Sequence, residues 1–109
     1  MKKALFLVLE DTRDALHTLE RLKDEGFNAT VATTESLKHA FDDPSEHHFI
    51  SLRHLDNENS SKESTFCMFV VDEEKLALAK KIIREETNNF KSIKGFMYSH
   101  SIEDYEGSI

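Results

Sequence analysis

Residues 65–87, TFCMFVVDEEKLALAKKIIREET, decide the fold class. The first part, Thr65–Val71, is rich in aromatic and β-branched residues, which favour strands. The second part, Glu73–Thr87, repeats apolar residues at the spacing of an amphipathic helix. The expected buried face of this helix consists of Leu76, Ala79, Ile82 and Ile83. The stretch therefore predicts a strand that runs directly into a helix.

The same succession of elements occurs twice in the chain. After the helix over Glu73–Thr87, a further β-rich run covers Ile93–Tyr98. The earlier copy comprises a strand over Ala4–Leu9, a helix over Thr12–Glu25 and a strand over Phe27–Ala32. Two such halves predict an α+β fold, the ferredoxin-like split β-α-β sandwich, in which helices cover one face of an antiparallel sheet.

Charge separates the predicted framework from two acidic segments. Residues 35–64 include three basic and seven acidic residues, and the C-terminal tail has three acidic and no basic ones. We therefore expect a single domain over residues 1–98, with a central insert over residues 33–64 and an acidic tail over residues 99–109.

The insert contains two further predicted elements. Glu35–Phe41 has the pattern of a short helix, which the proline after Asp43 would end. Phe49–Leu55 has the pattern of an extra strand. We expect this extra strand to pair back with Thr65–Val71 as a hairpin across a polar loop.

Local signals mark the ends of the elements. Asp72 is the predicted N-cap of the second helix, because a side-chain oxygen there can accept from the first free amides, and Asp11 or Thr12 has the same role in the first helix. Gly26 is expected to end that helix in a left-handed conformation. Gly95, inside the last strand, indicates a bulge or a close approach of two backbones. The expected buried face of the first helix consists of Ala15, Leu16, Leu19 and Leu22.

The composition excludes several classes of partner. The net charge of −7 disfavours nucleic acids and acidic lipid surfaces. Met1 is followed by two lysines and six apolar residues, which is too short for the apolar region of a signal peptide or a membrane span, so we expect a cytoplasmic protein. Cys67 is the single cysteine and lies in an apolar run, so it is expected to be buried and unable to form an intrachain disulfide.

The order of elements resembles the nitrogen-regulatory PII-like signalling superfamily. The resemblance is carried by the strand residues Phe27–Val31 after the helix stop at Gly26, and by the long insert that precedes Thr65–Val71. It implies a trimer that binds adenine nucleotides or related small effectors in clefts between subunits. It also implies that a long loop between the second and third strands carries the signal to a protein partner.

The resemblance also indicates candidate ligand-binding residues. Thr33 and Thr34 match the point at which the loop leaves the second strand, and residues 88–94 match the turn in which the family holds phosphate. This turn carries Lys91 and Lys94 but no glycine run. Since a cradle of backbone amides favours residues that tolerate unusual dihedrals, the resemblance implies a divergent member with a different small anionic effector, or none.

The insert offers two more chemistries. Arg53 could bind a phosphate or carboxylate bidentately, or point outward from an alternating strand. Histidines gather there among carboxylates and supply ligand types that zinc uses, although their spacing matches no established metal pattern. These residues are His39, His47, His48, His54, Asp42, Asp43 and Glu46. A metal-binding or metal-sensing protein is therefore an alternative function, and a structural protein-interaction module is another.

No catalytic motif is apparent in the sequence. Cys67 has no neighbouring base, and the run Ser99-His100-Ser101 lacks the strained turn that exposes a nucleophile. We therefore expect a protein that is not an enzyme, and the sequence identifies no cofactor.

The strand over Thr65–Val71 predicts self-association. Both of its alternating faces are apolar, whereas the predicted helices cover one face of the sheet. One face consists of Phe66, Met68 and Val70, and the other of Cys67, Phe69 and Val71. One of these sets is expected to face another molecule, so the sequence predicts a homo-oligomer, with a trimer favoured by the family resemblance.

Overall fold

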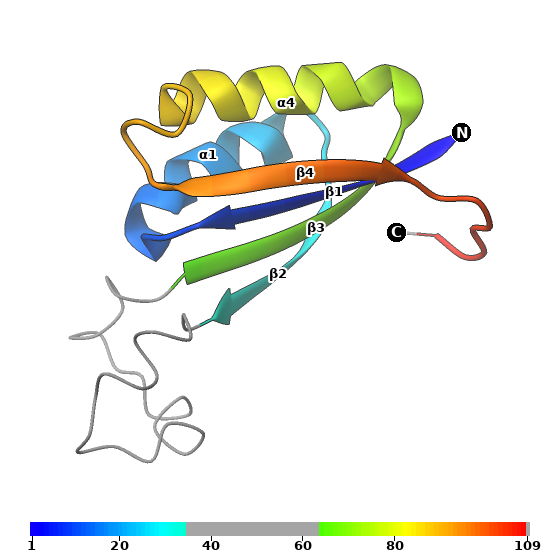
Figure 1. Cartoon of the computed structure of the whole chain (residues 1–109), viewed down its shortest axis with the longest axis horizontal. Helices are drawn as coiled ribbons and strands as arrows, with labels where there is room; N and C mark the ends of the chain where they lie inside the picture. The colour runs from blue at the N-terminus through cyan, green and yellow to red at the C-terminus, as the bar shows by residue number, and fades with distance from the viewer. Residues whose placement is uncertain (35–63, 109) are drawn as a thin grey trace, which may run out of the picture.

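The computed structural model describes residues 1–34 and 64–108, and the statements below concern those residues. They form a four-stranded sheet with two helices (Figure 1). In chain order the elements are β1 (Lys2–Leu9), α1 (Thr12–Asp24), β2 (Ala29–Thr34), β3 (Ser64–Asp72), α4 (Glu73–Thr87) and β4 (Gly95–Ser101). The predicted helix over Glu35–Phe41 and the predicted strand over Phe49–Leu55 lie outside the described residues.

The sheet confirms the predicted fold class. Its strand order is β2-β3-β1-β4, and each neighbouring pair is antiparallel. Both helices lie on the same face of the sheet (Figure 1). The central pair runs in register from Lys2 opposite Asp72 to Leu9 opposite Thr65. This arrangement is the ferredoxin-like sandwich expected from two β-α-β halves.

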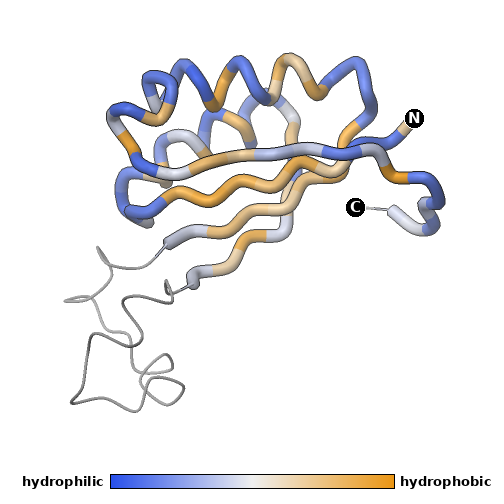
Figure 2. Tube along the Cα trace, in the orientation of Figure 1, coloured by the Kyte–Doolittle hydropathy of each residue, from blue (hydrophilic) through white to orange (hydrophobic). Residues whose placement is uncertain are grey.

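The core lies between the sheet and the helices. Along β1 and β3, alternate side chains point toward the helices and are fully or almost fully buried. Figure 2 shows hydrophobic residues concentrated along these two central strands. The core residues are Leu5, Leu7, Leu9, Ala15, Leu22, Phe27, Cys67, Phe69, Val71, Ala79, Ile82 and Ile83. Burial of this one continuous set is the main stabilising term of the fold.

The partner predicted for the extra strand is occupied. β3 pairs with β1 along one edge and with β2 along the other, from Ala29 opposite Phe69 to Thr34 opposite Ser64. Both edges of β3 are therefore already paired over the residues that face β2. The predicted hairpin between Phe49–Leu55 and Thr65–Val71 would need one of these edges. The strand that fills the position is β2, which belongs to the first half of the chain.

The two helices begin differently. Asp11 caps α1, since its carboxylate accepts from the backbone amides of Arg13 at 2.9 Å and Asp14 at 3.3 Å. Asp72 is the N-cap residue of α4, as predicted, but its carboxylate makes no capping hydrogen bond and instead lies 2.9 Å from the ammonium of Lys2, its register partner on β1. Lys2 thereby lowers the pKa of Asp72.

Neither described helix is long and apolar enough to span a bilayer.

The buried face of α1 is rotated relative to the prediction. Leu16 is 57% exposed, whereas Ala15, Thr18 and Leu22 are buried. The spacing of these three positions forms one continuous stripe that faces the sheet, and Leu16 lies on its flank.

On the outer side of the helix layer, Arg21 binds Glu85 at 2.8 Å and Glu86 at 3.0 Å, which joins α1 to α4.

The last strand begins and ends later in the sequence than predicted. β4 covers Gly95–Ser101 rather than Ile93–Tyr98, so it extends into the predicted tail. The chain then stays close to the sheet, because the Ile102 amide donates to the Lys2 carbonyl at 3.0 Å and the Tyr105 ring lies under the Lys2 ammonium, 5.4 Å from its centroid.

Gly95 is a point of close approach between β4 and β1. It pairs with Leu9, and a Cβ atom at this position would overlap the backbone carbonyl oxygen of Val8. The predicted close approach of two backbones is therefore confirmed, and it fixes where the last strand begins.

We expect Gly95→Ala to lower the free energy of unfolding by about 2 kcal/mol or more, because the added methyl group forces two backbones apart. Gly26→Ala is the matched control. Gly26 has a φ of 93° but open space around its Cβ position, so its replacement costs about 1 kcal/mol from conformation alone. Urea unfolding of both variants measures the difference. A loss at Gly95 no larger than that at Gly26 would contradict the steric account.

Candidate functional site

The face of the sheet opposite the helices carries a cluster of aromatic rings, which we call the open face. Phe6 on β1 stacks on Tyr98 at 5.0 Å between centroids and lies 5.9 Å from Phe66 on β3. Phe96 and Tyr98 on β4 are 54% and 52% exposed. No helix in the described part of the chain covers these rings (Figure 1). Large apolar side chains exposed together on one face indicate an interaction surface.

A pocket of about 330 Å³ lies at one end of this face, and we call it the strand-end pocket. It forms where β1 and β2 end and where β3 and β4 begin. Its lining combines apolar, hydroxyl and carboxylate groups, from Val8, Glu10, Thr34, Ser64, Gly95 and Phe96. Such a combination offers a surface for stacking beside groups that can form hydrogen bonds.

The structure brings together some of the predicted ligand-binding residues. Thr34 lines the strand-end pocket, and its hydroxyl donates to the Ser64 carbonyl at 3.3 Å. Lys94 lies beside the pocket, because its carbonyl accepts from the Glu10 amide at 2.8 Å. Thr33 belongs to the other face of the sheet, where it pairs with Thr65. Of the remaining two, Lys91 lies exposed in the turn after α4, and Arg53 lies outside the described residues.

Of the six residues that line the pocket, the sequence analysis predicted Thr34 as a ligand contact and missed the other five, among which Gly95 was predicted only as a bulge or a close backbone approach. Glu10 and Ser64 occupy strand ends, and Val8 and Phe96 sit on the open face next to them. Each is unremarkable in its own segment. The signal that identifies them is the strand register, which sets Val8 opposite Phe96.

The turn between α4 and β4 has an unusual backbone. Asn88, Asn89 and Phe90 have φ values of 53°, 57° and 62°, so three successive residues other than glycine are left-handed. Phe90 is held there by packing against the core. These three residues thus adopt the positive φ values that usually require glycine, although none of them is glycine.

Thr87 organises this turn. Its buried hydroxyl donates to the Ile83 carbonyl at 2.7 Å and accepts from the Phe90 amide at 3.0 Å. Its carbonyl accepts from the amides of Lys91 at 3.0 Å and Ser92 at 2.9 Å. The amides of Asn88 and Asn89 donate to carbonyls in the last turn of α4. All five amides from residue 88 to residue 92 are therefore engaged within the chain, so an anion at these five residues would contact side chains.

The described residues provide neither an activated cysteine nucleophile nor a group of metal ligands. Cys67 is fully buried, and burial raises the pKa of its thiol to about 11, so it is not an activated nucleophile. The described residues contain no group of His, Cys, Asp and Glu side chains that could hold a metal ion. The histidine and carboxylate cluster that predicted a metal site lies outside them.

Comparison with known proteins gives structural matches alone. No family model matches the sequence, and no curated protein matches it. A functionally unknown protein from Pediococcus pentosaceus ATCC 25745 aligns with a TM-score of 0.63 and 13% identity, over 98% of this chain and 97% of that one. A structure of CPII bound to ADP, AMP and acetate, from Thiomonas intermedia K12, aligns with a TM-score of 0.59 and 16% identity, over 91% of this chain and 83% of that one.

The chain has a PII-like fold. This confirms the fold that the resemblance implied. At these identities the likeness concerns the fold alone. Within this PII-like fold, the long connection follows β2 and precedes β3, and the strand-end pocket lies between those two strand ends.

We expect Thr87→Val to lower the free energy of unfolding by about 1–3 kcal/mol, because it removes the acceptor of the Phe90 amide inside a partly buried turn. Thr33→Val is the matched control, since it makes the same chemical change at an exposed position. Its effect should stay within about 0.5 kcal/mol. Urea unfolding measures both, and equal effects at the two positions would show that the Thr87 hydroxyl does not organise the turn.

Proposed function

We propose that this chain is a cytoplasmic PII-like regulatory protein that forms homo-oligomers, with a trimer favoured, and binds a small anionic effector in the strand-end pocket. In this proposal the effector is a nucleotide or another anion, and the signal passes to a protein target through the segment between β2 and β3. The observation that carries the proposal is the position of the pocket at one end of the aromatic open face, which neither described helix covers.

The open face supports self-association. Its rings are stacked on one another but remain partly or largely accessible, since Phe96 and Tyr98 are each more than half exposed. A second copy placed against them removes apolar surface from water, which contributes about 25 cal/mol per Å². Val8 and Phe96 belong both to this face and to the pocket, so a neighbouring copy would also close the pocket.

The pocket lining supports a small polar ligand with a planar part. Phe96 contributes an aromatic ring, the Ser64 hydroxyl offers a hydrogen bond, and the Thr34 hydroxyl, which donates to the Ser64 carbonyl, can still accept one. Lys94 and Lys91 supply positive charge at the adjoining turn. The similar CPII structure is bound to ADP and AMP, which makes adenine nucleotides the first ligands to test.

The position of the pocket also supports signalling. Thr34 is the last residue of β2 and Ser64 the first residue of β3, and both line the pocket. A ligand that contacts both residues therefore touches the two points at which the segment of residues 35–63 joins the sheet. Binding energy at these points can change the conformational preference of that segment, provided the ligand favours one state over another.

We expect the protein to elute as an oligomer, with three times the mass of one chain by light scattering. Tyr98→Glu should yield a folded monomer, because a carboxylate buried without a partner in an apolar interface costs several kcal/mol. Leu16→Glu is the control, since Leu16 is similarly exposed but lies on the helix layer, and its variant should keep the oligomer mass. A monomeric parent protein at micromolar concentration would overturn the assembly part of the proposal.

We expect AMP and ADP to raise the melting temperature and to bind with affinities within about threefold of each other, because the turn amides that could hold a second phosphate are already engaged. Lys94→Gln should weaken binding about tenfold, which is the usual scale for a charge-assisted hydrogen bond. Lys81→Gln, on the exposed side of α4, is the charge-matched control.

Isothermal titration measures the three proteins under one buffer condition. Absence of binding by either nucleotide and by a panel of other small anions would remove the effector part of the proposal. A marked preference for ADP over AMP would show that a second phosphate finds backbone or side-chain donors that this arrangement does not provide.

A further inference from the structure

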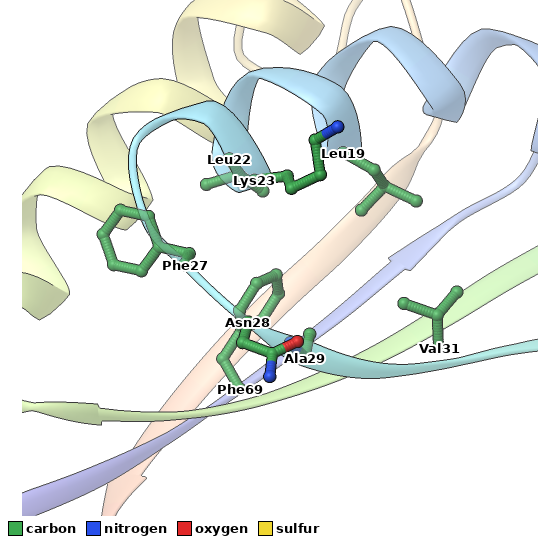
Figure 3. A pocket seen from close by; sticks show the side chains of 8 residues that line it. All are labelled: Leu19, Leu22, Lys23, Phe27, Asn28, Ala29, Val31 and Phe69. Atoms are coloured by element: carbon green, nitrogen blue, oxygen red, sulfur yellow. The ribbon is translucent and has the colours of Figure 1, made fainter. Parts of the chain in front are cut away.

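The lining of the strand-end pocket includes one charged residue, Glu10, which has no role in the function proposed above. A hollow between α1 and β2 offers a contrast, because its lining is mainly apolar and the Lys23 amine points away from it (Figure 3). A carboxylate beside a pocket proposed for an anion is unexpected, since like charges repel each other. Its presence restricts the anions that the pocket can accept.

Strand alternation places Glu10 on the open face of the sheet. Leu9, one residue earlier, is fully buried toward the helices, and successive side chains of a strand point to opposite faces. The Glu10 amide donates to the Lys94 carbonyl at 2.8 Å, which continues the pairing of β1 with β4 by one residue beyond Leu9 and Gly95. Glu10 and Lys94 are therefore cross-strand neighbours at the edge of the pocket.

The backbone is held on both sides of Glu10. Before it, β1 is paired with β3 and β4 up to Leu9. After it, the Asp11 carboxylate accepts from the amides of Arg13 and Asp14 and so fixes the start of α1. The base of the Glu10 side chain is thus in place before any ligand arrives, which lowers the entropy lost on binding.

The opposite charges of Glu10 and Lys94 are not paired with each other. Within residues 1–34 and 64–108, the ion pairs include neither side chain, and both residues are exposed. An ionised carboxylate only accepts hydrogen bonds, and an ammonium only donates them. A ligand that contacts both must therefore present an anionic group to Lys94 and hydrogen-bond donors to Glu10.

From this arrangement we infer that Glu10 makes the strand-end pocket selective for small anions that also carry hydrogen-bond donors, either sugar hydroxyls or an ammonium group. This inference rests on the effector site proposed above and narrows its ligand class. A ligand of this class gains contacts with both Lys94 and Glu10. A plain anion of similar size gains only the contact with Lys94, and the Glu10 carboxylate repels it.

The test compares two matched pairs of ligands by isothermal titration of the full chain. AMP is paired with its 2′,3′-dideoxy form, which lacks the sugar hydroxyls, and phosphoethanolamine is paired with ethyl phosphate, which lacks the ammonium group. In at least one pair we expect the donor-bearing ligand to bind about tenfold more tightly than the plain anion, the scale of a hydrogen bond to a charged group. The pair that shows the difference identifies the donor.

Glu10→Gln distinguishes recognition from simple repulsion. In this variant we expect the affinity for the donor-bearing ligand to fall and the affinity for the plain anion to rise, so that the preference disappears. Loss of a negative charge alone would raise both affinities. Glu20→Gln is the charge-matched control, since Glu20 is exposed on α1 across the sheet, and this variant should keep the preference.

Three outcomes would overturn the inference and leave the effector site in place: equal affinities within both pairs, a preference that persists in Glu10→Gln, or a parallel rise of both affinities in that variant. If none of the four ligands binds, the effector site itself fails and the inference fails with it. The melting temperature of Glu10→Gln should match that of the parent chain, because the exposed Glu10 side chain forms no ion pair with the other described residues.

Discussion

The structure depends on the antiparallel pairing of β1 with β3, two strands that are apolar on both faces. Toward the helices their side chains build the core, in which Leu5, Leu7 and Phe69 are almost fully enclosed. Toward the other side the same strands present Phe6 and Phe66, whose rings extend the stack that begins on β4. The chain has helices for one face only in its described part. Since exposed aromatic surface is unfavourable in water, the strand pair that makes the fold stable also supplies the surface for the association proposed above.

The same pairing determines where a ligand can bind. In an antiparallel pair the end of one strand meets the start of the other, so Glu10 and Ser64 come to the same edge of the sheet. Gly95 brings the start of β4 against β1 at this edge, and the missing Cβ atom allows the close contact. The strand-end pocket is thus a consequence of register. The hollow between α1 and β2 arises from a different mismatch, since the edge strand extends beyond the cover that α1 provides.

The periodicity of the sequence was sufficient to predict the fold class, and α4 occupies the predicted range of residues. Predictions that required long-range partners were less accurate. A helical pattern does not fix the rotation of a helix, so Leu16 was placed in the core in place of Thr18. Asp72 has the local features of a cap, but its partner Lys2 comes from the other end of the chain. Of the residues that line the strand-end pocket, the family resemblance had indicated Thr34, and the others became recognisable only from the strand register.

The turn after α4 shows how a PII-like fold can change its ligand chemistry without changing its path. The family resemblance implies a glycine-rich turn whose amides hold phosphate, and here the oxygens of Thr87 accept three of the amides in that turn. An amide that donates to the end of its own helix is a poor partner for a ligand, because the internal bond would have to break first. In the proposed effector site, recognition then rests on the lysine side chains of the turn and on the hydroxyl and aromatic groups at the strand ends. In the proposed oligomer a neighbouring copy adds groups to this site, so its selectivity would be a property of the assembly.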